Sequence, residues 1–241
     1  MLTKNHAILR AEVTAHIEAD AVIAGDYWIT DGGSVVGGRG CFIGCLAHSD
    51  DATVLQDRFG MPLMLVRVIE GIFERLSPND KQAGIDFFDA IPNAVGRDGK
   101  DLSLVVWAFL ASELRALPTV SDDVHAVIDP VIAGMDLLAS GGRWHAAYAA
   151  YADYDAAYAY ADSDYAAAYA ATYAARAAYA AYDADSAYAA RATYATYAAR
   201  AAAYAAAYDA AYDAASTAVT LRQRDTILKL MADAPVMEAA V

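Results

Sequence analysis

The second half of the chain contains no glycine and no proline between Trp144 and Ala234, and it consists largely of alanine and tyrosine. Alanine has the highest helix propensity and loses no side-chain entropy in a helix, so this composition predicts helix. One uninterrupted helix over this tract would be about 135 Å long. Clusters of Asp and Ser at 162–164, 183–186 and 213–217 are typical of helix N-caps and divide the tract into helices of ordinary length. We therefore predict a folded-back helical bundle, with a long rod as the alternative.

The tyrosines of this tract recur at steps of three or four residues, so each run forms one stripe along one helix face. The alanines between them let neighbouring helices approach closely, while the tyrosine rings fill the remaining space. Packing is the simpler interpretation of such a stripe. The alternative is an aromatic surface that binds a protein partner or another ligand. The candidate binding residues of this tract are Tyr148, Tyr151, Tyr165, Tyr169, Tyr173, Tyr204 and Tyr208.

The first half shows the 3.6-residue period of amphipathic helices, interrupted by glycine and proline. The predicted helices begin near Thr3, Asp50 or Asp51, Pro62, Ser77, Leu102 and Ser121. The glycine-rich stretch from Tyr27 to Gly44 is predicted as a loop with a small hairpin around residues 34–36. The fold class is therefore all-α. It comprises a compact multi-helix domain over residues 1–142 and an Ala/Tyr-rich helical region over residues 143–241.

The formal net charge of −14 argues against direct binding of the nucleic-acid backbone, where Lys and Arg must replace counterions. It favours a protein partner with a basic, nucleic-acid-binding surface, although a high charge also simply keeps proteins soluble. The apolar stretches are too short to span a bilayer, and the N-terminus lacks a secretory signal. The chain has only two cysteines, which suits a reducing compartment. We therefore predict a protein of the bacterial cytoplasm, not bound to a membrane.

One segment carries residues capable of chemistry, namely Cys41, Cys45 and His48. If this segment is helical, the two thiols lie on one face, with the imidazole one turn further on. Such a set can bind Zn²⁺, with His16, His6 or an acidic side chain as a fourth ligand; otherwise no cofactor is expected. A second interpretation makes one cysteine a nucleophile with His48 as its base. A third treats both cysteines as small buried apolar residues beneath which glycines allow close packing.

The glycine-rich stretch also invites comparison with phosphate-binding loops, but it matches neither the P-loop nor the dinucleotide fingerprint. Its aromatic pair Tyr27 and Trp28, together with Arg39, could line a small binding pocket.

Several short strings in the first half resemble a family of uncharacterised proteins found in bacteria and their phages, commonly with an Ala-rich helical tail. The resemblance covers roughly residues 27–107 and rests on Tyr27-Trp28, Gly40-Cys41-Phe42-Ile43-Gly44-Cys45-Leu46-Ala47-His48, Phe59-Gly60-Met61-Pro62, and Ile72-Phe73-Glu74 before Leu76-Ser77-Pro78. It implies a gene carried by phages or mobile elements, where small acidic proteins often inhibit host defences. It carries over no catalytic residues.

Three classes of function follow from these observations. The leading hypothesis is a non-enzymatic binding protein, an inhibitor or adaptor that acts on a host protein through an acidic, tyrosine-rich surface. The second is an enzyme or metal-dependent ligand binder that uses the Cys/His segment. The third is a structural homo-oligomer held together by the Ala/Tyr helices.

Overall fold

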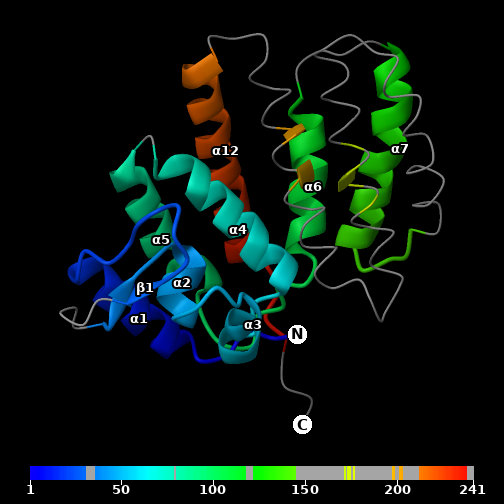
Figure 1. Cartoon of the computed structure of the whole chain (residues 1–241). Coiled ribbons are helices and arrows are strands. Elements are labelled where there is room, and N and C mark those ends of the chain that lie inside the picture. The colour runs from blue at the N-terminus through cyan, green and yellow to red at the C-terminus, as the bar shows by residue number, and fades with distance from the viewer. Residues whose placement is uncertain are drawn as a thin grey trace. The chain divides into compact units, whose positions relative to one another are not determined.

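The chain is represented by a computed structural model whose described part is mostly helical, with one two-stranded sheet, so the all-α prediction is confirmed (Figure 1). The described residues are 1–30, 36–78, 80–117, 122–144, 171, 173–174, 176, 197–198, 201–202 and 212–237, without the side chains of 123, 124, 127 and 212–216. Among these residues, no helix is both long enough and apolar enough to cross a membrane.

The helices and strands follow the predicted order. The helices are α1 (His6–Glu18), α2 (Phe42–Ala47), α3 (Thr53–Phe59), α4 (Leu63–Leu76), α5 (Lys81–Val95), α6 (Val105–Arg115), α7 (Asp122–Ala139) and α12 (Tyr212–Asp233). The strands β1 (Ile29–Thr30) and β2 (Gly38–Arg39) form an antiparallel hairpin in which Ile29 lies opposite Arg39.

The chain divides into two compact units, and the second is inserted into the first. The first unit comprises residues 1–103 and 224–241, and the second comprises residues 104–223. The boundary predicted after Gly142 lies inside the second unit. The chain passes from the first unit to the second just before α6 and returns to the first inside α12. The last residues of the chain therefore belong to the first unit.

The first unit is organised around the apolar face of α4. Five apolar residues that recur at the helical period after Pro62 form this face, and all are buried: Leu65, Val68, Ile69, Ile72 and Leu76. The rings of Phe42 in α2 and Phe88 in α5 meet edge to face, with centroids 6.1 Å apart, which joins two further helices to this core. The 3.6-residue period therefore predicted the core of this unit correctly.

Two predicted helix starts are wrong, for the same physical reason. Thr3 does not cap α1; its hydroxyl donates to the carbonyl of Arg97 at 2.8 Å and accepts from the N–H of Lys100 at 2.8 Å. Ser77 does not open α5; Asp80 does, because its carboxylate accepts from the N–H of Ala83 at 3.1 Å. In both places the expected capping residue belongs to another part of the structure: Thr3 bonds to the backbone of Arg97 and Lys100, and Ser77 ends α4 in helical conformation.

α5 does not end at its internal proline, Pro92. The helix continues past the proline to Val95 and ends at Gly96, which has φ +75°. A proline removes one hydrogen bond inside a helix but does not have to end it. Glycine adopts a positive φ without steric cost and so supplies the actual end of the helix.

Lys100 joins the C-terminal end of α12 to the first unit. Its buried ammonium group donates to the carbonyls of Ala94 at 3.1 Å, Met231 at 2.8 Å and Ala232 at 2.7 Å. These carbonyls lie at the C-terminal ends of α5 and α12, where backbone acceptors have no partners within the helix. Burial lowers the pKa of Lys100, while the three carbonyls stabilise its charged form. One side chain therefore caps two helices.

The second unit contains a buried charge network between α6 and α12. The carboxylate of Glu113 is 1% exposed and accepts two hydrogen bonds from the guanidinium of Arg222, both at 2.9 Å. The amide of Gln223, which is fully buried, donates to the same carboxylate at 2.7 Å. A buried carboxylate is tolerated only when its oxygens are paired in this way.

A few residues of the Ala/Tyr tract are described. Tyr173 and Tyr197 meet edge to face with ring centroids 5.3 Å apart, whereas one continuous helix would separate them by about 36 Å. This contact favours the folded-back bundle over the rod. Four alanines of the tract are buried, as expected for closely approaching helices: Ala171, Ala174, Ala198 and Ala202.

Candidate functional site

The segment that carries the two cysteines is shaped by glycines on which another part of the backbone lies. A Cβ atom on Gly40 would come within 1.9 Å of the carbonyl oxygen of Tyr27, and one on Gly44 within 1.2 Å. The chain that enters β1 therefore crosses directly over α2, and only glycine leaves room for it. The repeated glycines of this segment serve this close approach.

Both thiols lie in the core. Cys41 and Cys45 are 2% and 0% exposed, and the Cys45 thiol donates to the carbonyl of Gly40 at 3.2 Å. Burial raises the pKa of Cys41 to about 11, although the N–H groups of Gly44 and Ile43 act in the opposite direction. Burial likewise raises the pKa of Cys45 to about 12. At neutral pH both side chains are therefore thiols, which are poor nucleophiles.

His48 does not join the two thiols. It ends α2 in the left-handed conformation with φ 54°, and its ring stacks on Trp28 with centroids 4.7 Å apart and an interplanar angle of 18°. Among the described residues, no three His, Cys, Asp or Glu side chains form a group that could hold a metal ion. Zinc binding by Cys41, Cys45 and His48 stays a prediction without support in their geometry, and so does the pairing of a nucleophilic cysteine with His48.

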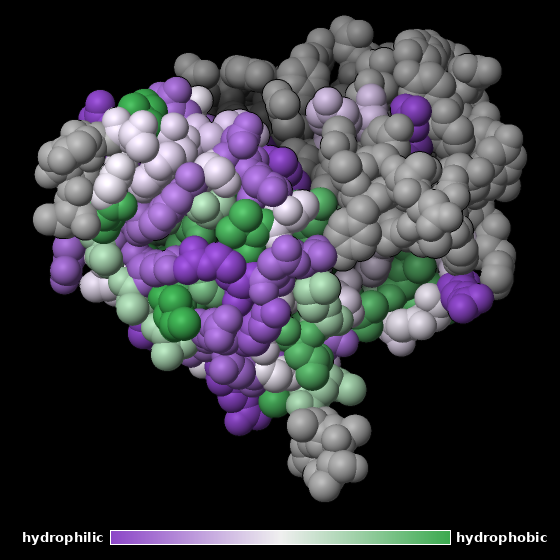
Figure 2. Space-filling view, turned by 60° about the horizontal axis from the view of Figure 1, so that its bottom comes forward, coloured by the Kyte–Doolittle hydropathy of each residue, from purple (hydrophilic) through white to green (hydrophobic). Residues whose placement is uncertain are grey.

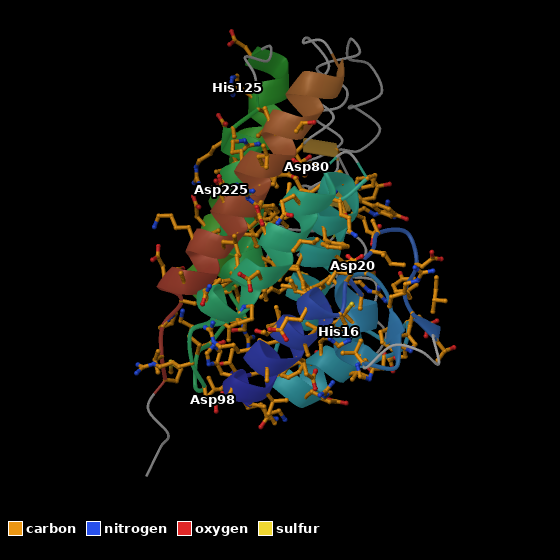
Figure 3. The ribbon with its side chains drawn as sticks, turned by 90° about the vertical axis from the view of Figure 1, so that its left-hand side faces the viewer. His16, Asp20, Asp80, Asp98, His125 and Asp225 are labelled. Carbon is orange, nitrogen blue, oxygen red and sulfur yellow. The ribbon has the colours of Figure 1, made fainter. Side chains whose placement is uncertain are left out.

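Trp28 forms the centre of a ring cluster that the sequence did not indicate. His16, which Figure 3 labels on α1, lies edge-on to Trp28 with centroids 6.0 Å apart. Its ring centroid lies 5.4 Å from that of His48. On the other side, Gly38 packs against the indole, since a Cβ atom there would lie 2.6 Å from the ring. The cluster joins the end of α1, the end of α2 and both strands of the hairpin.

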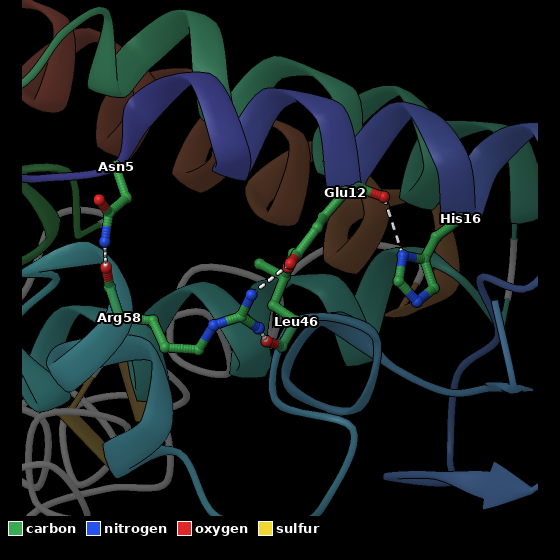
Figure 4. A network of polar contacts seen from close by, with 5 residues as sticks. All are labelled: Asn5, Glu12, His16, Leu46 and Arg58. Atoms are coloured by element: carbon green, nitrogen blue, oxygen red, sulfur yellow. Dashed lines mark hydrogen bonds and ion pairs between the residues drawn. The ribbon is translucent and has the colours of Figure 1, made fainter.

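A polar network supports His16 and joins α1 to α2 and α3 (Figure 4). The carboxylate of Glu12 pairs with the guanidinium of Arg58, which also donates to the carbonyl of Leu46 at 2.6 Å. The carbonyl of Glu12 lies 2.8 Å from Nδ1 of His16. Because these residues come from three helices, helical periodicity could not have predicted the network.

A second network lies under Tyr27. The guanidinium of Arg67 donates to the Tyr27 hydroxyl at 3.3 Å and to the carboxylate of Glu70 at 2.9 Å. The carboxylate of Glu74, beside the Cys41 thiol, accepts from the N–H of Gly25 at 2.8 Å. Burial raises the pKa of Glu74, and burial together with Glu70 raises the pKa of Tyr27. These contacts fix the loop before β1 to α4.

The remaining candidate residues have separate positions. Arg39 is exposed in β2, opposite Ile29. The Lys81 ion pair, with a smaller contribution from Arg39, lowers the pKa of Asp20. Tyr173 lies half-buried in the second unit, with the guanidinium of Arg176 5.6 Å from its ring centroid. The other tyrosines proposed for binding lie outside the described residues: Tyr148, Tyr151, Tyr165, Tyr169, Tyr204 and Tyr208.

The hairpin presents two large side chains to solvent. Tyr27 and Ile29 are 43% and 38% exposed. The two residues are separated in the sequence by Trp28, whose ring stacks on His48. Figure 2 shows one face of the molecule, on which hydrophilic side chains predominate and hydrophobic ones form small separate groups. Tyr27 and Ile29 are two of the large apolar side chains exposed in the described part of the first unit; the others are Met1, Leu2, Ile8, Val236 and Met237.

Comparison with known proteins does not add a function to this geometry. The chain matches no family model, no curated protein and no solved structure. The protein can therefore be described only by its own structure. It is a mostly helical protein of two units whose Gly-Cys segment is packed in the core and whose hairpin is exposed.

Proposed function

We propose that the chain is a non-enzymatic protein-binding protein, and that its contact surface in the first unit is the hairpin edge, defined by Tyr27 and Ile29. The observation that carries this proposal is the exposure of these two neighbouring side chains, 43% and 38%. Tyrosine is enriched in protein interfaces, and an exposed apolar group on an otherwise polar surface commonly marks one.

The position of β1 in the sheet supports the same conclusion. β2 pairs with β1 on one side, and Gly40, directly after β2, forms a parallel bridge with Val22 on the other. Within the described part of the chain, β1 is therefore the edge strand. An edge strand offers backbone donors and acceptors to an added strand as well as its side chains.

The charge of the chain indicates the kind of partner. The net charge is −14, and Asp26, directly before Tyr27, is exposed. A partner with a basic surface would be attracted to this protein over a distance and held at the hairpin edge by apolar contact. That such a partner is a host defence protein follows only from the resemblance to phage proteins, and it is part of the proposal.

The environment of the cysteines supports a non-catalytic role. Both thiols are buried, and burial raises the pKa of Cys41 to about 11 and that of Cys45 to about 12. A reactive cysteine needs a lowered pKa and access to its substrate, and neither condition is met.

The proposal is tested by replacing the hairpin edge. We expect the double variant Tyr27→Ser/Ile29→Ser to fold, because neither side chain belongs to the buried core, and to bind its partner at least about tenfold more weakly than wild type. The measurement is quantitative affinity enrichment from bacterial lysate at low and physiological salt, followed by titration of each recovered protein against purified variants.

The matched control is Ile8→Ser on α1, which removes an apolar side chain of similar exposure, 48%, from another part of the same unit. This control is expected to retain the partner. Recovery of no specific protein at either salt concentration would contradict the proposal. Equal binding by wild type and the hairpin variant would contradict the assignment of the surface.

A further inference from the structure

His16 is a buried imidazole with one unsatisfied nitrogen. The side chain belongs to a residue that is 2% exposed, and its Nε2 is buried without a hydrogen-bond partner. Its Nδ1 lies 2.8 Å from the carbonyl oxygen of Glu12, which can only accept, so Nδ1 carries the proton. The neutral ring therefore has its lone pair on Nε2, within the ring cluster.

The surroundings of His16 oppose a second proton. Protonation would turn Nε2 into a donor that has no acceptor in contact, and it would place a charge beside the stacked rings of Trp28 and His48. The groups that act electrostatically on His16 are Glu12 from α1 itself, which is paired with Arg58 of α3, and His48 from the end of α2. A buried, unpaired charge is costly, so the packing of this cluster depends on a neutral ring.

The backbone next to His16 holds the hairpin. The N–H of Ala21 donates to the carbonyl of His16 at 2.9 Å, and the carbonyl of Ala21 accepts from Gly40 at 2.9 Å. The N–H of Ile23 in turn donates to Gly40 at 2.9 Å. Trp28, directly before β1, contacts both His48 and Gly38 of β2, so the ring cluster is joined to both strands of the hairpin. A change in the charge of His16 therefore acts directly on the position of the hairpin.

We propose that the cluster of His16, Trp28 and His48 is an acid-sensitive latch, which holds the hairpin against α1 while His16 is neutral and releases it when His16 takes up a proton. The latch itself is a property of the first unit. Its consequence for binding, a hairpin edge that changes position in acid, rests on the proposed function.

The direction of the pH effect follows from the linkage of protonation and stability. Burial, with a smaller contribution from His48, lowers the pKa of His16 from 6.5. The folded state then binds this proton less tightly than the unfolded state. The contribution of neutral His16 to the stability of the folded state is therefore complete above pH 6.5 and is lost as the pH falls below it. Glu74, which holds Gly25 of the neighbouring loop, acts in the opposite sense: burial raises its pKa, so acid favours its folded form.

The test is hydrogen exchange of the full-length protein at pH 7.5 and pH 5.5, corrected for the intrinsic exchange rate. We expect the amides of Ile23 and Gly40 to lose protection roughly tenfold in acid, the limit for one proton being about tenfold per pH unit. His16→Phe, which keeps a ring but cannot take up a proton, is expected to retain protection at both pH values.

Two further variants keep the result interpretable. His48→Asn, a residue that tolerates the left-handed conformation, removes a neighbour that lowers the pKa of His16, so the loss of protection between pH 7.5 and pH 5.5 should be smaller than in wild type. His125→Gln, at an exposed position of the second unit, should respond as wild type does. Protection in wild type that is unchanged at pH 5.5, or a loss that persists in His16→Phe, would overturn the latch. Because the protein is measured alone, neither result depends on a partner.

Discussion

Gly44→Ala is expected to destabilise the first unit by about 4 kcal/mol or more, which places it among the most damaging single substitutions. The added methyl carbon would lie 1.2 Å from the carbonyl oxygen of Tyr27, so the backbone before β1 would have to move away from α2. Helix propensity alone predicts the opposite, a gain of about 1 kcal/mol. Urea denaturation followed by circular dichroism measures the difference.

The control for this variant is a substitution at the next residue of the same helix, Cys45. Cys45→Ala removes a buried sulfur and its hydrogen bond to the carbonyl of Gly40, and it should cost only about 1–2 kcal/mol. If Gly44→Ala were as stable as wild type, the backbone crossing over α2 would be refuted.

The second large effect is expected in the other unit. Glu113→Ala removes a carboxylate that holds the half-buried Arg222 and the fully buried amide of Gln223, and should cost about 3–5 kcal/mol. The loss arises mainly because groups that were paired with the carboxylate are left without it. The measurement is calorimetric unfolding, with attention to the transition of the second unit.

An exposed ion pair of the same unit provides the comparison. Arg115 pairs with Asp136 where both side chains are about half exposed, so Asp136→Ala should cost at most about 1 kcal/mol. A Glu113→Ala protein as stable as Asp136→Ala would contradict the buried network between α6 and α12.

The sequence predicted those parts of the fold that depend on neighbouring residues. The apolar face of α4 could be read from its period, and the hairpin from the glycines around it. Competing caps could not be resolved, because Thr3 and Ser77 are good capping residues whose use depends on distant partners. The discontinuous first unit could not be predicted either. It depends on Lys100, whose acceptors at Met231 and Ala232 lie far along the chain.

The candidate site was predicted in part. The spacing correctly placed two cysteines and a histidine around one short helix, and the interpretation of the cysteines as packing agrees with their burial. The spacing did not predict where the side chain of His48 points. The left-handed conformation of His48 at the end of α2 turns its ring toward Trp28. The neighbours of His48 come from α1 and from the hairpin, and helical spacing carries no information about such long-range contacts.

Cys41 and Cys45 are core residues, and we propose that the first unit acts through its exposed hairpin and not through thiol chemistry. The most direct test is the rate at which a thiol reagent modifies the native protein at pH 7.5. With both thiols buried and burial raising the pKa of Cys41 to about 11 and that of Cys45 to about 12, modification should be no faster than unfolding, and both should react once the chain is denatured. Rapid modification of one thiol in the folded protein, with a pH midpoint below about 8.5, would instead identify a reactive cysteine and contradict the account.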